Sequence, residues 1–593
     1  MTSRLLSVFL IMIGFNGLSQ SDYLITYYEK SGCKATPTYD ETVAYCQLLD
    51  QVSEMIHYTT FGKSPQGRDL PLLIIDADGY TSPEQAEQAG KFILLIEAGI
   101  HSGEIDGKDA GLMFFRDLAI KKQFGDIPDN ITFLFIPIFS VDGHERSGPY
   151  NRINQDGPEE MGWRTTAQNL NLNRDFLKAD APEMQAWLRL YQRWQPDFLV
   201  DIHVTDGADY QYVMTYGLET FGNLEAGLTN WTVDQFIPAM DNFMDKAGYP
   251  AHPYVMFRRW HDPRSGLRSS VAGPRFSVGY AAAQNRIGLL VENHSLKDYK
   301  TRVTGTYELL KFLNKFLSEH AATIKKLNAD ADIYTGSEDF RSQPFPVNYK
   351  AGPDSILVDF RGVEYDVVTS DLTGGDWFIY HPDRPATFRV PYFNRQIASA
   401  TVQIPEAYAV PAEWTEMIGK LALHGIQYTI VEHPVTIRVE SYRFTKVEYG
   451  KSTYEGRLQV TPVFEPITED REFPAGSAVI PTNQRTAKIL VHMFEPASPD
   501  SYLQWGYFNA IFELKEYFET YIMEEYARNM LAEEPGLREE FEKWKADNPE
   551  AARSQWSQLE WFYFRSPWVD AKRNVYPVGR ILNQSILDEL IKN

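Results

Sequence analysis

Short apolar runs alternate with amphipathic stretches over roughly the first half of the chain. Such runs, separated by segments of helical periodicity, predict an α/β domain with a buried sheet. Because active crevices in open α/β sheets lie at the carboxyl ends of the strands, we expect one shared site where the runs end in polar residues. The four runs that end in this way are Phe92–Ala98, Ile131–Ile138, Pro196–Val200 and Ile287–Val291.

The pattern changes after a polar stretch at residues 328–339, which we interpret as a domain boundary. Short β-branched and aromatic runs from residue 356 to about 491 predict a mostly β unit, with a helix at 413–424. Residues 502–564 are helical in pattern and strongly charged. The expected organisation is a signal peptide at 1–20, a catalytic α/β domain at 21–330, a β-rich accessory domain at 340–500 and a helical region at 501–593.

The length and net charge of the chain exclude some of the functions that a protein of this kind could have. The chain has 593 residues, 43% of them hydrophobic, which is enough to form the cores of several domains. It has 57 Lys and Arg against 80 Asp and Glu, a net charge of -23. This balance repels polyphosphates and anionic membrane surfaces, so nucleic acid is excluded as a partner.

The N-terminus is typical of an export signal. Arg4 is followed by the apolar run Leu5–Phe15 and by the small and polar residues Asn16–Gln20. A membrane anchor is the alternative, but the run is shorter than the ~20 residues that cross a bilayer. We therefore expect a periplasmic or secreted protein that begins near Ser21, without stable membrane insertion after cleavage.

Two cysteines, Cys33 and Cys46, follow this signal. In an oxidising compartment such a pair can close a short disulfide loop, and two reduced thiols are the alternative. Their spacing does not fit a CxxC metal or redox site. The pair therefore gives no evidence for a cysteine-based activity.

Candidate metal ligands follow two of the apolar runs. His101 and Glu104 lie three residues apart where the first run is expected to turn into a helix. Catalytic zinc commonly takes three protein ligands and leaves a position for water, so a third ligand is required. His203 is the best candidate because it also follows an apolar run, with His144 and His294 as fallbacks.

Hydrolysis of an amide at such a metal also needs a base and a cation for the developing oxyanion. Glu292 follows five apolar residues and is the candidate base, with a simple ion pair as the alternative. Arg164 is the candidate cation. Asn173 and Arg174 can hold a carboxylate, since the guanidinium group binds carboxylates bidentately.

Taken in chain order, these residues resemble the zinc carboxypeptidases of the carboxypeptidase A/B superfamily, over about residues 45–325. The resemblance implies a mixed β-sheet flanked by helices and one zinc ion per chain. It implies zinc ligation by His101, Glu104 and His203, with Glu292 as general base. It also implies that Arg164 stabilises the oxyanion and that Asn173 and Arg174 bind the substrate's C-terminal carboxylate. The matching residues are His101–Glu104, Asn171–Phe176, His203 and Glu292.

The implied function is that of an exported zinc metallocarboxypeptidase, which hydrolyses C-terminal bonds of peptides and proteins through a zinc-activated water. One alternative is a zinc-dependent acylase or amidohydrolase of the same fold. Another is an inactive protein that binds peptides or glycans. The chain has no Gly-x-Ser-x-Gly elbow and no phosphate-binding loop, which disfavours serine hydrolases and nucleotide enzymes.

Two features depart from the family. Asn171 stands where the family has an Asp that orients a zinc histidine, so that histidine should be a less basic ligand. The family's mobile tyrosine has no secure counterpart, because Tyr280 is the only Tyr between Tyr254 and Glu292 and lies close to Glu292.

Charged residues near the expected pocket do not decide which substrate side chain it binds. One group would favour anionic substrates and the other basic ones. The first group is Arg264, Arg268 and Arg275, and the second is Asp201, Asp206 and Asp209.

Overall fold

The computed structural model of the protein describes residues 24–587. The predicted signal at residues 1–20 lies outside the described residues. The chain divides into two compact units, and the first combines the residues up to Gln403 with the later segments Lys420–Ile426 and Asn483–His492. The second unit takes Ile404–Gly419, Gln427–Thr482 and the chain from Met493 onward.

The first unit is built on an eight-stranded mixed sheet with the order β1-β2-β4-β3-β5-β9-β6-β7. Strands β4, β3, β5 and β9 are parallel, and β2 and β6 join them in antiparallel orientation. The parallel strands are almost continuously apolar because the sheet is buried on both faces. The strands are β1 Ile56–Lys63, β2 Asp69–Asp76, β3 Phe92–Ala98, β4 Ile131–Ile136, β5 Phe198–Thr205, β6 Met214–Leu218, β7 Ala251–Pro253 and β9 Ile287–His294.

Helices flank this sheet, which confirms the predicted α/β fold class. Helices α4 and α10 pack against each other and against β3, while α6 lies against β1 and α9 against β9. The main apolar core joins these strands to residues of α2, α4, α8 and α10. The helices are α1 Tyr27–Lys30, α2 Tyr39–Val52, α3 Pro83–Gln88, α4 Asp106–Ala119, α5 Val141–His144, α6 Pro182–Trp194, α7 Ala226–Trp231, α8 Ile237–Ala247, α9 Ser277–Ala283, α10 Tyr299–Thr335 and α11 Glu338–Arg341.

Helix α10 runs through most of the polar stretch that suggested a domain boundary. Asn328, Ala331 and Thr335 are buried at helical spacing in this stretch. Asn328 donates to the backbone of Asp197, and Thr335 donates to Asn285. The division into units therefore differs from the predicted one, because buried polar contacts keep the helix in the first unit.

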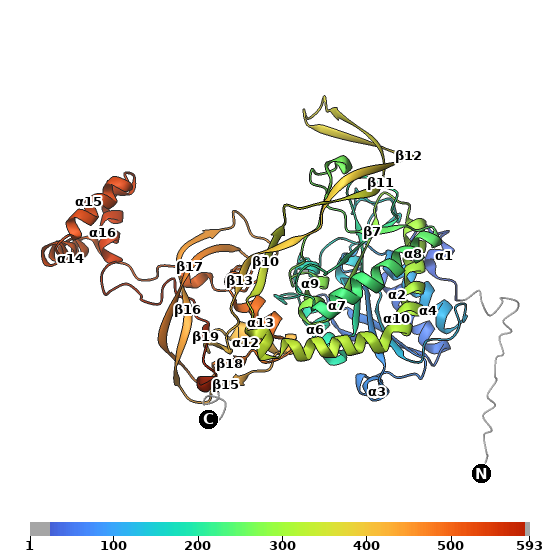
Figure 1. Ribbon diagram of the computed structural model, residues 1–593, viewed down its shortest axis with the longest axis horizontal. Coiled ribbons are helices and arrows are strands. Elements are labelled where there is room, and N and C mark those ends of the chain that lie inside the picture. Colours follow the sequence, from blue (N-terminus) through green and yellow to red (C-terminus); the bar gives the residue numbers. More distant parts are fainter. Residues whose placement is uncertain (1–23, 588–593) are drawn as a thin grey trace, which may run out of the picture. The chain divides into compact units, whose positions relative to one another are not determined.

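Further strands complete the first unit. The antiparallel strands β11 and β12 form a long hairpin, at the top of Figure 1, and β12 also pairs with β8. β10 pairs with β13. The bounds are β8 Leu267–Arg268, β10 Phe345–Ala351, β11 Ile356–Thr369, β12 Asp376–Phe393 and β13 Gln396–Val402.

The second unit contains a six-stranded sheet with the order β15-β18-β14-β19-β16-β17. Helices α14, α15 and α16 have an apolar core of their own, which includes Met523, Phe541 and Trp561. The bounds are β14 Ala407–Val410, β15 Thr429–Ile430, β16 Val435–Tyr449, β17 Val460–Phe473, β18 Ala478–Pro481, α14 Thr520–Glu533, α15 Leu537–Asp547, α16 Gln555–Tyr563 and β19 Gly579–Ile581. Helices α12 Thr415–Leu421 and α13 Ala487–Phe494 are divided between the units, because residues 420–421 and 487–492 belong to the first.

Two further observations bear on the sequence predictions. Cys33 and Cys46 are free thiols in the structure, and Cys46 is fully buried. Among residues 24–587, no helix combines the length and the apolar character needed to cross a membrane.

Candidate active site

Three side chains predicted as metal ligands converge at the carboxyl edge of the sheet. Their ligand atoms all lie within 4.8 Å of one another. Nδ1 of His203 lies 3.2 Å from Nδ1 of His101 and 2.9 Å from Oε2 of Glu104. Nδ1 of His101 lies 3.1 Å from the same Glu104 oxygen. Two imidazole nitrogens and a carboxylate oxygen are the donor set of a catalytic zinc site, so these residues fit the expected ion.

The opposite ring nitrogens of both histidines have fixed partners. Nε2 of His101 lies 2.9 Å from Oδ1 of Asn171, and Nε2 of His203 lies 2.8 Å from Oδ2 of Asp201. Ser277 donates to the same Asp201 oxygen at 2.5 Å. These contacts set the ring orientations and leave both Nδ1 atoms directed at the shared point. Asn171 thus lies beside one candidate zinc histidine, His101, and Asp201 is a carboxylate partner for the other, His203.

The other carboxylate oxygen of Glu104, Oε1, lies between two arginines and therefore in a strongly positive environment. Oε1 accepts from Arg152 at 2.8 Å and from Arg164 at 3.0 Å, while Oε2 accepts from the backbone N–H of Val204 at 3.1 Å. Burial alone would raise the pKa of Glu104, but His101 and Arg152 bring it well below its usual range. Burial lowers the pKa of His101 to about 4, although Glu104 opposes this. At neutral pH a charged carboxylate and a neutral imidazole face the shared point.

Glu292 lies beside this cluster on the neighbouring strand. In the parallel pairing of β5 with β9, His203 is the direct partner of Glu292. Oε2 of Glu292 is buried and has no hydrogen-bond partner. Burial is the main reason that the pKa of Glu292 rises to about 8, and the nearby His203 opposes that rise. The carboxyl group is therefore poised to exchange a proton near neutral pH.

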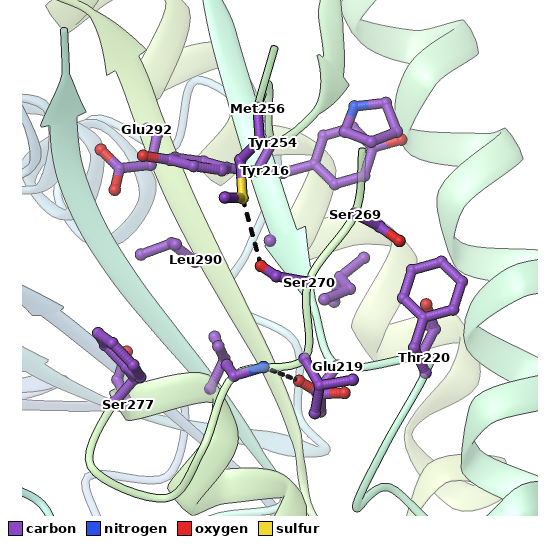
Figure 2. A pocket seen from close by; sticks show the side chains of 18 of the residues that line it. Tyr216, Glu219, Thr220, Tyr254, Met256, Ser269, Ser270, Ser277, Leu290 and Glu292 are labelled. Atoms are coloured by element: carbon purple, nitrogen blue, oxygen red, sulfur yellow. Dashed lines mark hydrogen bonds between the residues drawn. The ribbon is translucent and has the colours of Figure 1, made fainter. Parts of the chain in front are cut away.

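A pocket of about 550 Å³ opens at this point (Figure 2). His101, Arg164, Asn173, Arg174 and Glu292 all contribute to its wall. The guanidinium carbon of Arg174 lies 4.5 Å above the ring of Phe276, and its Nη1 donates to the carbonyl of Asn173. The remaining wall is formed mainly by the end of β6, by residues 253–256 and by residues 269–278.

Other histidines considered from the sequence lie elsewhere. Nε2 of His144 lies 2.8 Å from Nζ of Lys108, and Nε2 of His294 lies 2.9 Å from the carbonyl of Ala208. Within the described residues, neither belongs to the metal-binding group. Tyr280 is fully buried, with its hydroxyl 3.0 Å from Nδ1 of His424, so it does not line the pocket.

Three residues of the site went unrecognised in the sequence. Arg152 lies in a long irregular loop without periodicity, and Tyr254 lies just after a three-residue strand. Glu219 directly follows β6. A strand-end position was the one available signal, and it applied to Glu219 and to Tyr254 but not to Arg152.

Comparison with known proteins matches residues 42–220 to the zinc carboxypeptidase family model. The chain carries a zinc carboxypeptidase domain. This match confirms the resemblance to zinc carboxypeptidases that was found in the sequence. It also confirms that the protein is an enzyme of the metallocarboxypeptidase class. The domain's candidate base, Glu292, lies beyond the matched range.

Curated relatives and solved structures carry the same type of name. The chain is 21% identical over 492 residues to "Carboxypeptidase 2" of Trichophyton tonsurans, covering 79% of this chain and 84% of the relative. The corresponding protein of Trichophyton rubrum is 21% identical over 489 residues, with the same coverage. A carboxypeptidase A from Helicoverpa armigera aligns with TM-score 0.36 and 17% identity over 50% of this chain and 75% of that chain.

Proposed function

We propose that this protein is an exported zinc-dependent carboxypeptidase that hydrolyses the C-terminal peptide bond of peptides and proteins. The observation that supports it best is the meeting of three ligand atoms with a base, Glu292, and a carboxylate-binding pair, Asn173 and Arg174, around one pocket. Export rests on the sequence of residues 1–20 alone.

His101, Glu104 and His203 would hold one zinc ion per chain. Zinc in such a site acts as a Lewis acid and makes water a nucleophile at neutral pH. Asn171 and Asp201 keep the two imidazoles in the tautomer and orientation that ligation needs.

Glu292 acts as the general base. Its unpartnered Oε2 accepts a proton from the attacking water and then returns that proton to the leaving amine. The raised pKa of Glu292, to about 8, favours this two-way transfer because it makes the carboxylate a stronger base than an ordinary glutamate and keeps both protonation states accessible near neutral pH.

Two arginines act on the substrate. Arg164 is 44% exposed and can turn from Glu104 toward the carbonyl oxygen, where negative charge develops in the transition state. Arg174, with Asn173, binds the terminal carboxylate and so places the last peptide bond next to Glu292.

The test compares three kinds of substrate: a peptide with a free C-terminus, its C-terminal amide and an N-acyl amino acid. We expect one-residue trimming of the free acid and resistance of the amide. Glu292→Gln should retain zinc but lose at least about a hundredfold in kcat. Hydrolysis of the N-acyl amino acid without cleavage of longer peptides would instead identify an acylase, and equal cleavage of acid and amide would contradict the role of Arg174.

A further inference from the structure

One acidic side chain lies deep in the pocket, away from the catalytic residues. Glu219 follows directly after β6, which pairs antiparallel with β9 so that Thr215 faces Glu292 and Gly217 faces Leu290. Side chains alternate along a strand, so the position of Glu219 shares the face of Thr215 and Glu292. Figure 2 shows Glu292 and Glu219 at opposite ends of the pocket.

Glu219 is buried with an incomplete set of partners. It is 5% exposed, and its Oε2 accepts from the backbone N–H of Ala272 at 2.7 Å. Its Oε1 is buried without a hydrogen bond of good geometry, although the backbone N–H groups of Phe221 and Gly222 lie near the carboxylate. Burial raises the pKa of Glu219 to about 8, against the lowering effect of neighbouring backbone N–H groups. A buried carboxylate without a counter-charge is unfavourable, so this position suits a cation from outside the chain.

The rest of the pocket offers no competing charge. Apart from the residues assigned to catalysis and carboxylate binding, Glu219 is the one charged side chain among the described residues of the wall. Apolar side chains such as Phe221, Val233 and Leu290 line the space, and the arginines that suggested an anionic substrate are absent from it. Apolar walls that end in a carboxylate match a side chain with an aliphatic stem and a cationic tip.

The spacing also favours a long side chain. Glu219 is the fourth residue after Thr215, the strand partner of Glu292, which corresponds to about 13 Å along a strand. Gly217 lies midway, and a Cβ there would approach Cβ of Leu290 to 3.2 Å. The missing side chain keeps the path open between the reacting bond and Glu219.

We propose that this pocket binds a lysine or arginine side chain of the substrate's C-terminal residue and that Glu219 is its counter-charge. The inference rests on the proposed carboxypeptidase function and specifies its substrate class: peptides with a basic C-terminal residue. Arginine can bind the carboxylate through its planar guanidinium group, and lysine through a flexible four-carbon stem.

The competing explanation is that Glu219 only anchors the loop at Ala272. Glu219→Gln separates the two roles, because the amide oxygen can still accept from the Ala272 N–H while the negative charge is lost. Glu225→Gln is the matched control. Glu225 accepts from the backbone N–H groups of Gly227 and Leu228 at the start of α7, and it does not line the pocket.

The experiment measures kcat/KM for peptides that differ only in the last residue, Arg, Lys, Leu or Glu. We expect the wild type to prefer Arg and Lys. Glu219→Gln should lower kcat/KM for the Arg and Lys peptides roughly 10- to 150-fold, as expected for the loss of a charged hydrogen bond. It should change kcat/KM for the Leu peptide by only a few fold. Glu225→Gln should leave the preference intact. Equal wild-type rates for Arg and Leu, or an equal loss on all peptides in Glu219→Gln, would overturn the proposal.

A binding measurement keeps this result separate from the proposed catalysis. Calorimetry on Glu292→Gln compares Ala-Ala-Arg with Ala-Ala-Leu, and tighter binding of the first that disappears in Glu219→Gln/Glu292→Gln supports the basic pocket without turnover. Hydrolysis of all four peptides at equal rates would leave the carboxypeptidase proposal standing and reject the pocket assignment. Absence of any hydrolysis by the wild type, with the binding preference intact, would reject the carboxypeptidase proposal alone.

Discussion

The two oxygens of Glu104 lie in different surroundings. Oε2 faces the two histidines, whereas Oε1 is shared by Arg152 and Arg164. The side chain of Arg152 is 13% exposed and that of Arg164 is 44% exposed. Arg164 is therefore the arginine that can leave for the substrate, and Arg152 stays to neutralise Glu104 when it does.

This division of roles predicts the effect of Arg152→Gln. Without Arg152, Arg164 is the remaining arginine on Glu104 and is held there, so kcat should fall roughly 10-fold or more while KM changes less. Arg152→Lys should restore part of the loss. Arg189→Gln, which alters an exposed arginine on α6, serves as the control. Steady-state kinetics that left kcat of Arg152→Gln near the wild-type value would show that Arg152 does not position the site.

The metal assignment predicts different outcomes for two buried histidines on neighbouring strands. His203→Gln removes a ligand and should lose zinc and activity while the chain stays folded, since the apolar core does not depend on the ion. His294→Gln should keep its zinc, because His294 contacts the carbonyl of Ala208 instead. Metal analysis together with circular dichroism checks both. Full zinc occupancy in His203→Gln would disprove that ligand.

The burial of Glu183 leads us to expect that the unfolding free energy depends on pH. It is fully buried, neither carboxylate oxygen has a hydrogen-bond partner, and burial raises its pKa to about 7. A carboxyl whose pKa is raised in the folded state destabilises the fold progressively as pH rises from about 4.5 to 7. Glu183→Gln should therefore add about 1 to 3 kcal/mol to the unfolding free energy at pH 8 and much less at pH 5. Denaturant unfolding at both pH values measures this difference, with the exposed Glu54→Gln as the control. An equal gain in unfolding free energy at pH 5 and pH 8 would contradict the prediction.

At the scale of elements, apolar periodicity was sufficient to locate the central strands. β3 begins and ends at the predicted residues, and the run before Glu292 became β9. The polar residues after the other runs were partly absorbed into the strands, because β5 continues to Thr205 and β9 to His294. The sheet edge still brings them together, since direct strand pairing aligns His203 with Glu292.

Other features could not be predicted from periodicity. The loop that carries Arg152 has no repeat of apolar residues, so its contact with Glu104 depends on the folded path of the chain. The end of α10 was mistaken for a boundary because its buried positions include the polar Asn328 and Thr335. Both features depend on specific polar contacts between residues distant in sequence.

The contacts of the segment Lys420–Ile426 lead us to expect that a substitution there affects substrate binding at a distance. Nζ of Lys420 donates to the carbonyl of Lys178 at 2.6 Å and to Asp180 at 2.7 Å, and Lys178 in turn pairs with Asp175, next to Arg174. Lys420→Met should cost about 1 to 3 kcal/mol of stability, because it removes a buried donor to the carbonyl of Lys178 and one of the two ammonium groups that pair with Asp180.

In the same variant KM should rise by a larger factor than kcat falls, since we propose that Arg174 binds the substrate carboxylate. Thermal unfolding and steady-state kinetics check both effects, with exposed Lys451→Met as the control. Unchanged stability and KM would show that this segment does not support the turn that carries Arg174.

At the scale of the whole molecule, the first compact unit is not a continuous stretch of chain. Residues 340–403 belong to it, as do Lys420–Ile426 and Asn483–His492. Within this unit, Lys488 donates to Asn223 and Asn285, and Arg485 donates to Gln284. Segments from the second half of the sequence therefore complete the polar surroundings of α9 and of the loop before α7.

This arrangement predicts that a chain ending at residue 339 will not fold properly. It would lose the hairpin partners of β8 and leave buried polar groups such as Asn285 with fewer partners, each at a cost of about 1 to 3 kcal/mol. We expect an insoluble or loosely packed product. Replacing residues 514–569 by a short flexible linker is the matched deletion, because that region has its own apolar core and β19 is retained. This variant should keep zinc and wild-type kcat/KM, as judged by solubility, thermal unfolding and peptide hydrolysis. A soluble 1–339 fragment with full activity would show that the later segments are dispensable for the peptidase fold.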